Sequence, residues 1–268
     1  MPTLLAIPFP VIDPVLVEIG PFAIRWYALS YIVSIVIGWR LAMSLARKPG
    51  SLITPEQVDG LLLWATLGVV LGGRSGYVLF YNLPYFLEHP GEIFAVWHGG
   101  MSYHGGMLGV ILAMLLYARN AGIRFLALAD IIATVTPIGL FFGRLANFIN
   151  GELWGRAAPD VAWAMVFPTG GPEPRHPSQL YQATMEGLLL FILLNIVFRV
   201  PAYREKPGFT GGLFLAGYGL ARIVGELFRQ PDAQIGYLIG GTTMGQWLSL
   251  PMVLVGLYFM ARAKKIEA

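Results

Sequence analysis

Long apolar segments are the feature that most constrains the fold of this chain. A helix needs about 20 consecutive, mostly apolar residues to cross the hydrocarbon core of a bilayer. Segments of this kind recur along the whole sequence, and short polar stretches separate them. The pattern predicts an all-α polytopic membrane protein with about seven transmembrane helices. The predicted spans are Phe22–Ser44, Val58–Phe80, Gly100–Tyr117, Phe125–Phe148, Leu180–Phe198, Gly211–Phe228 and Met244–Ala261.

The composition agrees with a membrane protein and excludes several other classes. Hydrophobic residues make up 56 % of the 268 residues and charged residues only 12 %, about half the share in soluble domains. The cations are scattered and form no basic stripe, so we expect no nucleic-acid partner. The chain has no cysteine, which excludes disulfides, thiolate metal sites and a thiol nucleophile of its own. No motif has metal-ligand spacing, and we expect neither a metal site nor a cofactor.

Lysines and arginines in the loops predict the orientation in the membrane. One set of span ends carries most of the 18 cations, including every lysine. Because cationic loops stay in the cytoplasm, these ends are assigned to the cytoplasmic side. Seven spans then place the N-terminus in the periplasm and the C-terminus in the cytoplasm. We expect one transmembrane domain, residues 1–268, with a small periplasmic cap at residues 151–178 between the fourth and fifth spans.

Glycine pairs four residues apart occur in three of the predicted spans. They lie in the sequences GVVLG, GGMLG and GLFFG. Small residues at this spacing let two helix backbones approach closely. The three motifs therefore predict helix–helix contacts.

Polar residues gather near the predicted outer ends of five spans. At 1.5 Å of rise per residue, Arg144 lies about 27 Å and Arg74 about 24 Å from the cytoplasmic ends of their helices. Arg222 lies about 17 Å along the sixth span. His104 and Tyr27 also lie near outer helix ends. We expect these groups to share the outer half of the bilayer.

The sixth span carries a row of polar residues on one face. Tyr218, Arg222, Glu226 and Arg229 are spaced by four, four and three residues, which places them on one side of a helix. Charge is costly in lipid, so this face should point into the protein.

Two interpretations of these charges are open. The arginines and carboxylates could simply fasten helices, with Arg74 and Arg229 snorkelling to the headgroups. Alternatively, an excess of arginines around a cavity could bind an anion such as a phospholipid headgroup.

The sequence FFGRLANFINGELWGR ends the fourth span with a polar cluster. Arg144 and Asn147 are three residues apart and share a face of the helix. Asn150 followed by Gly151 predicts the point where the helix stops. The cluster is therefore either a C-terminal capping network or a device in which the asparagines and Glu152 orient the Arg144 guanidinium toward a phosphate.

His104, in the sequence WHGGMSYHGG, is a candidate proton acceptor. Histidine titrates near neutral pH and commonly serves as a general base. A single histidine at a helix start can equally be a capping or hydrogen-bonded residue. The shared depth of His104 and the arginines favours the functional interpretation.

Four motifs, in order, resemble one known family. GGMSYHGG, GRLANFINGELWG, RHPSQLY and GYGLARIVGELFRQPD closely resemble segments of the prolipoprotein diacylglyceryl transferase family of the bacterial inner membrane. The resemblance covers nearly the whole chain. It implies transfer of the diacylglyceryl group of phosphatidylglycerol to the lipobox cysteine in a prolipoprotein signal peptide, with a thioether as product and glycerol 1-phosphate released. It also implies contact with membrane lipids and an active site toward the periplasm.

The same resemblance implies roles for particular residues. Arg144 and Arg222 would hold the lipid phosphate and stabilise its charge as it leaves. His104 would be the candidate base for the cysteine thiol. The residues expected to shape the phosphate site or line the cavity are Tyr27, Asn147, Glu152, Gly155, Tyr218, Glu226 and Arg229.

Two other functions remain as alternatives. A transporter or flippase for an anionic lipid or solute would use the same arginines. Inverted repeats and broken helices at the bilayer midplane are typical of such proteins, and the sequence has neither. A purely structural membrane protein would have no evident use for a charged outer cavity.

Overall fold

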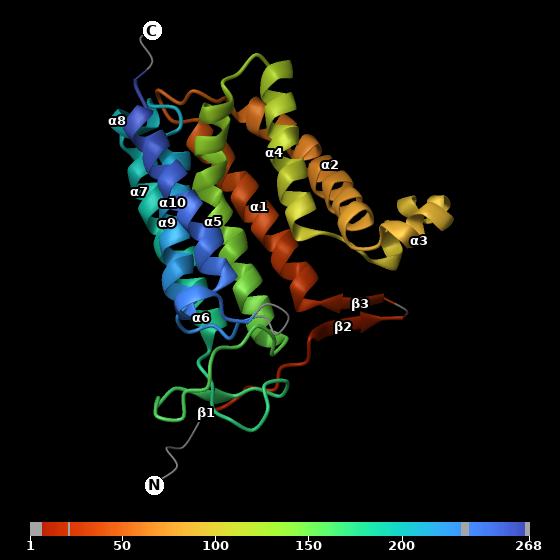
Figure 1. The fold of residues 1–268 in the computed structure, drawn as a ribbon. Helices are drawn as coiled ribbons and strands as arrows, with labels where there is room; N and C mark the ends of the chain where they lie inside the picture. The colour runs from red at the N-terminus through yellow and green to blue at the C-terminus, as the bar shows by residue number, and fades with distance from the viewer. Residues whose placement is uncertain (1–6, 21, 232–235, 266–268) are drawn as a thin grey trace. The chain divides into compact units, whose positions relative to one another are not determined.

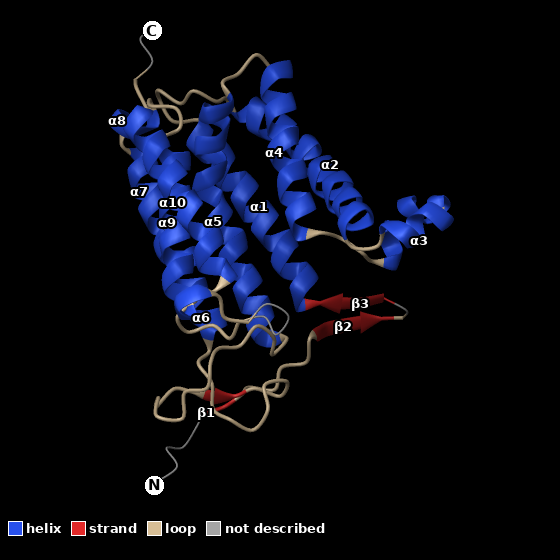
Figure 2. Cartoon of the chain, viewed as in Figure 1, coloured by secondary structure: helices blue, strands red, loops and turns tan. Residues whose placement is uncertain are grey.

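The computed structural model describes residues 7–20, 22–231 and 236–265, and most of them are helical (Figures 1 and 2). Most helices are long and apolar, as the sequence predicts. The elements in chain order are β1 (Ile7–Pro8), β2 (Val15–Ile19), β3 (Phe22–Arg25), α1 (Trp26–Ala46), α2 (Pro55–Phe80), α3 (Leu83–Glu88), η1 (Pro90–Phe94), η2 (Val96–His98), α4 (Tyr103–Asn120), α5 (Phe125–Ile149), β4 (Met165–Val166), α6 (Ser178–Gln182), η3 (Ala183–Leu189), α7 (Leu190–Arg199), α8 (Pro201–Arg204), α9 (Phe209–Gly225), η4 (Ile239–Gly241) and α10 (Met244–Arg262).

Within the described residues, five helices are long and apolar enough to cross a membrane. They are α1, α2, α5, the continuous helix formed by α6, η3 and α7, and α10. A multi-pass membrane protein is therefore supported. Two of the predicted spans differ from this set. The sixth corresponds to α9, an apolar helix of 17 residues, and the third corresponds to α4, of 18 residues.

The chain divides into two compact units, Met1–Leu41 with Asp130–Ala268, and Ala42–Ala129. In the second unit, α2 and α4 pack along their length, because glycines on both helices leave room for close backbone contact. A Cβ at Gly68 would lie 2.6 Å from the carbonyl oxygen of Gly109, and one at Gly72 would meet the carbonyl of Gly105. The contacts predicted from GVVLG and GGMLG are confirmed.

The third glycine motif behaves differently. Gly139 and Gly143 on α5 have no heavy atom within 4 Å of the position that a Cβ would take. The predicted close contact at GLFFG is therefore wrong. In the first unit a different glycine brings helices together. A Cβ on Gly187 of η3 would lie 2.8 Å from the Cα of Phe141 on α5.

Among the described residues, four short strands lie outside the helices, so the prediction of a purely helical fold holds only for the spans. β1 pairs in parallel with β4, which lies inside the segment 151–178. β2 pairs antiparallel with β3. Phe9 packs its ring 5.2 Å from the rings of both Phe148 and Phe167. These aromatic contacts join the segment before β2 to the end of α5 and to the loop after β4.

Candidate functional site

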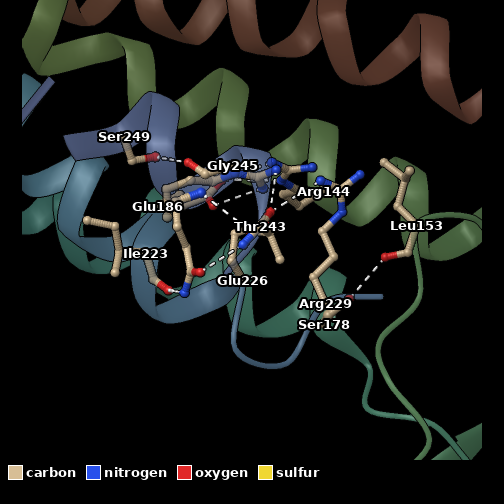
Figure 3. Close-up of polar contacts among 12 residues, drawn as sticks. Arg144, Leu153, Ser178, Glu186, Ile223, Glu226, Arg229, Thr243, Gly245 and Ser249 are labelled. Atoms are coloured by element: carbon tan, nitrogen blue, oxygen red, sulfur yellow. Dashed lines mark hydrogen bonds and ion pairs between the residues drawn. The ribbon is translucent and has the colours of Figure 1, made fainter. Parts of the chain in front are cut away.

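A fully buried carboxylate, Glu186, is the centre of a cluster of charges in the first unit (Figure 3). On α5, Arg144 places Nη2 3.1 Å and Nε 3.3 Å from Oε2 of Glu186. On α9, Arg222 places Nη1 3.6 Å from Oε1 of the same carboxylate. Two predicted site residues from different helices therefore meet at a residue that the sequence analysis did not single out.

The local backbone explains how Glu186 reaches Arg144. Residues Ala183–Leu189 form a π-helical segment inside the continuous helix that runs from α6 to α7. Such segments are rare and are frequently found at functional sites. The following residue, Gly187, contacts the α5 backbone at Phe141, less than one turn before Arg144. Close approach at Gly187 thus brings the two charged side chains together.

A second carboxylate, Glu226, binds three side chains and is 2 % exposed. Its Oε1 lies 2.7 Å from Nη2 of Arg222 and 3.3 Å from Nη1 of Arg229. Its Oε2 accepts a hydrogen bond of 2.7 Å from Oγ1 of Thr243, the N-cap residue of α10. The shared face predicted for Arg222, Glu226 and Arg229 is confirmed by these contacts.

The cluster is rich in arginine. Three guanidinium groups, those of Arg144, Arg222 and Arg229, meet two carboxylates. Each of the three arginine side chains is no more than 16 % exposed. Guanidinium groups held in such surroundings can bind the oxygens of an anion. A pocket lined by Glu226, Arg229, Thr243 and Gly245 opens at one side of the cluster.

Arg156 fixes the end of α9 and was also missed as a site residue. Its Nη2 donates to the carbonyl oxygen of Glu226 over 2.9 Å and its Nε to that of Arg229 over 3.1 Å. The backbone N–H of Arg156 donates to the carbonyl of Phe228 over 2.8 Å. Arginine donors at a helix C-terminus satisfy carbonyls that lack intrahelical partners. Arg156 therefore positions both Glu226 and Arg229.

Gly155 lies where two backbone segments come together. A Cβ there would stand 2.5 Å from the carbonyl oxygen of His176 and 2.6 Å from that of Phe228. The N–H of Gly155 donates to the His176 carbonyl over 2.9 Å. Only glycine fits, and the contact aligns the loop after α5 with the end of α9.

The polar end of α5 is a capping network, as one of the two interpretations predicted. The N–H of Gly151 bonds to the carbonyl of Phe148, and the N–H of Glu152 to that of Asn147. With φ of +65° at Gly151, this is the Schellman arrangement. The Glu152 carboxylate accepts hydrogen bonds from the amides of Asn147 and Asn150 at 2.8 and 3.2 Å. The alternative in which these residues hold Arg144 is not what the contacts show, because Arg144 binds Glu186.

Arg74 is a structural residue of the second unit. It is 6 % exposed, and its guanidinium donates to the carbonyls of Glu92, Ile93, Gly99 and Gly100 at 2.5 to 3.1 Å. Snorkelling of Arg74 to the headgroups is therefore wrong. Its donors organise the loop between α2 and α4.

The other predicted residues are placed as follows. His104 is the second residue of α4, in the second unit; it is exposed and its ring contacts that of Tyr103. Tyr27, in the first turn of α1, is 38 % exposed and its hydroxyl lies 3.3 Å from that of Tyr31. Tyr218 stacks on Phe214 of α9 at 5.9 Å.

His176 is a further titratable group that the sequence analysis passed over. Its Nδ1 lies 3.1 Å from the hydroxyl of Tyr181, which accepts a hydrogen bond of 2.6 Å from the Trp163 indole. Partial burial, and then the nearby charge of Arg156, lower the pKa of His176 below its usual value. The imidazole is thus held toward its neutral form. Among the described residues, no group of three or more potential metal ligands comes together.

Apolar helices that enclose paired arginines and carboxylates define a multi-pass membrane protein with a charged site within its helices. More specifically, the chain belongs to the prolipoprotein diacylglyceryl transferase family, whose model matches residues 14–262. Similar proteins, each named phosphatidylglycerol–prolipoprotein diacylglyceryl transferase, come from Rhodospirillum rubrum (60 % identical, covering 98 % of this chain and 97 % of the relative), Azospirillum brasilense (56 %, covering 99 % of each) and Paramagnetospirillum magneticum (57 %, covering 96 % of each).

Proposed function

We propose that this protein transfers the sn-1,2-diacylglyceryl group of phosphatidylglycerol to the thiol of a lipobox cysteine in prolipoproteins. Membership of the family and the names of the relatives support the reaction class and both substrates. The observation in this chain that supports the proposal is the buried cluster in which Arg144 and Arg222 both contact Glu186. Two buried guanidinium groups from different helices suit the negatively charged oxygens of a phosphodiester.

The proposed step is a displacement at carbon. The substrate cysteine loses its proton to a base, and its sulfur forms a bond to the glyceryl carbon that carries the phosphate ester. The bond between that carbon and the phosphate oxygen breaks, and glycerol 1-phosphate leaves with the electron pair. Arg144 and Arg222 would bind the phosphate and stabilise the charge that develops on it. A thiol with a pKa near 8.5 needs only a modest base at neutral pH, and His104 is the candidate.

The remaining predicted residues would support this site rather than react. Glu226 would orient Arg222 and Arg229 through its two contacts. Asn147, Glu152 and Gly155 would shape the floor of the phosphate site at the end of α5. The hydroxyls of Tyr27 and Tyr218 would line the lipid-binding cavity. No cofactor enters the proposed reaction.

The proposed setting is the bacterial inner membrane, with the active site toward the periplasm. The asymmetric distribution of lysine and arginine supports seven spans, a periplasmic N-terminus and a cytoplasmic C-terminus. We keep the prediction that residues 1–268 form one transmembrane domain. Residues 151–178 would be its periplasmic cap.

Purified protein incubated with phosphatidylglycerol and a lipobox peptide tests the proposal. The expected result is a peptide whose mass increases by one diacylglyceryl group, with the label on the cysteine. A peptide in which serine replaces the cysteine is the matched control and should stay unmodified. Lipid movement across the vesicle bilayer without any change in peptide mass would instead support a transporter.

A further inference from the structure

Gln182 is a buried polar side chain without a polar partner. It is the last residue of α6 and is fully buried. Neither Nε2 nor Oε1 has a hydrogen-bond partner among the described residues. Buried amides are nearly always hydrogen-bonded in native proteins, since an unmade bond leaves the cost of desolvation uncompensated. The amide of Gln182 is therefore available to a group that the protein itself does not supply.

The position of Gln182 joins it to the charged cluster. It lies four residues before Glu186 on the same continuous helix, so the two side chains project from neighbouring turns. On the facing helix, Cγ and Nε2 of Gln182 lie 3.3 and 3.6 Å from the position of a Cβ at Gly225. Gly225 directly precedes Glu226, which binds Arg222 and Arg229. The unpartnered amide is thus one helical turn from Glu186, the carboxylate that Arg144 and Arg222 share.

Other polar atoms without hydrogen bonds lie on the same helix. Gln179 is also fully buried, and its Oε1 has no partner although its Nε2 donates to the carbonyl of Glu152. Gln179 and Gln182 are three residues apart and share a face of α6. Unpartnered acceptor and donor atoms are therefore presented within one turn of this helix.

The chemistry of the amide restricts what it can bind. A hydroxyl group both donates and accepts, so a diol satisfies Oε1 and Nε2 of Gln182 at once. A phosphate oxygen satisfies only Nε2. An ammonium group satisfies only Oε1.

We propose that Gln182 binds the hydroxyls of the headgroup glycerol and so selects phosphatidylglycerol over lipids with other headgroups. This inference rests on the proposed function, because it assigns the part of the same lipid that lies beyond the phosphate. Arg144 and Arg222 bind what all phospholipids share. Gln182 binds the headgroup glycerol, which distinguishes phosphatidylglycerol from the other phospholipids.

The test compares lipids that differ only in the headgroup. Phosphatidylglycerol, phosphatidylpropanol and phosphatidylethanolamine with identical acyl chains are each supplied with the lipobox peptide, and kcat/KM for transfer is measured. The wild-type protein should prefer phosphatidylglycerol to phosphatidylpropanol by at least about tenfold, since a site built to bind a hydroxyl rejects the analogue without it. In Gln182→Met, which keeps the length of the side chain, transfer from phosphatidylglycerol should fall about tenfold or more and transfer from phosphatidylpropanol less than about twofold.

Two further variants of this protein serve as controls for the test. Gln57→Met makes the same substitution in the capping box of α2, and its headgroup preference should equal that of the wild type. Gln182→Glu retains the shape and an acceptor and should keep part of the preference. Equal loss with both lipids in Gln182→Met, or equal wild-type use of phosphatidylglycerol and phosphatidylpropanol, would overturn the inference while leaving the transferase proposal standing. Absence of transfer from every lipid by the wild type would refute the proposed function and the inference with it.

Discussion

Arg144 and Glu186 bind each other between α5 and η3, with two guanidinium nitrogens 3.1 and 3.3 Å from one carboxylate oxygen. The pair fixes the plane of the Arg144 guanidinium. Nη1 of Arg144 is not used in this contact, so a donor edge remains for a further acceptor. Glu186 thereby orients an arginine instead of merely neutralising it, and the contact to Arg222 extends the same control to a second helix.

Replacing Glu186 by Gln should therefore damage the site and the fold together. The substitution keeps the shape but leaves buried Arg144 without its carboxylate and Arg222 with Glu226 alone. Breaking a buried pair typically costs about 3–5 kcal/mol. We expect a lower thermal midpoint in detergent and a loss of transfer of at least about tenfold. The exposed pair of Glu205 and Lys265, 2.6 Å apart, provides the control: Glu205→Gln should change neither quantity measurably. Wild-type values in Glu186→Gln would show that the carboxylate has no such role.

Arg144 and Arg222 should each tolerate replacement by alanine in folding but not in catalysis. Loss of an electrostatic stabiliser of a leaving group costs about 10²–10³ in kcat. Lysine keeps the charge and loses the planar fork, so Arg144→Lys and Arg222→Lys should retain only a small fraction of activity. Turnover and far-ultraviolet circular dichroism of the four variants separate these effects. Turnover at the wild-type rate in either alanine variant would remove that arginine from the proposed phosphate clamp.

Arg74 is expected to behave differently from the other buried arginines. Its four carbonyl partners lie between Glu92 and Gly100, so Arg74→Met leaves that loop without its donors. Limited proteolysis should then cleave between residues 92 and 100 faster than in the wild type. The KM for phosphatidylglycerol should stay within about twofold, because the buried guanidinium of Arg74 binds loop carbonyls and not the lipid. A large rise in KM without faster cleavage would contradict this prediction and indicate that Arg74 binds the lipid.

The sequence was sufficient for the long apolar helices and for part of the site. Apolar length predicted the long helices, and helical spacing predicted that Arg222, Glu226 and Arg229 share one face, because both follow from local geometry. The stop at Asn150 and Gly151 was equally local. Arg222 and Arg144 could be paired in one site only through their estimated depth.

Other features depend on contacts between distant segments and could not be predicted. Glu186 meets Arg144 because a π-helical segment and Gly187 adjust the approach of two helices, and neither is visible in an apolar pattern. A signal for Glu186 did exist, since a single carboxylate inside a span is a functional candidate by default. For Arg74 the estimated depth was misleading, because it resembled the depth of the site arginines. Its true partners lie in a loop, and no periodic pattern in the sequence predicts them.

His104 is predicted to determine the pH dependence of transfer. A general base must be unprotonated to accept the thiol proton, so transfer that depends on His104 should be slower in acid. His104→Gln should lower kcat by about 10²-fold or more and remove the acidic limb of the profile. His98→Gln, at the exposed end of η2, should keep the wild-type profile. An unchanged profile in His104→Gln would require another base.

His176 should make the folded state sensitive to mild acid. Partial burial and the charge of Arg156 lower its pKa in the folded protein, so the unfolded chain binds the proton more tightly. The contribution to stability is then complete above the unfolded pKa of about 6.5 and is lost as pH falls through the lower folded pKa. Thermal midpoints measured between about pH 5 and 8 should decline at the acidic end in the wild type and decline less in His176→Gln. His98→Gln should follow the wild-type curve. If His176→Gln keeps the full acidic decline, another group is responsible for the acid response.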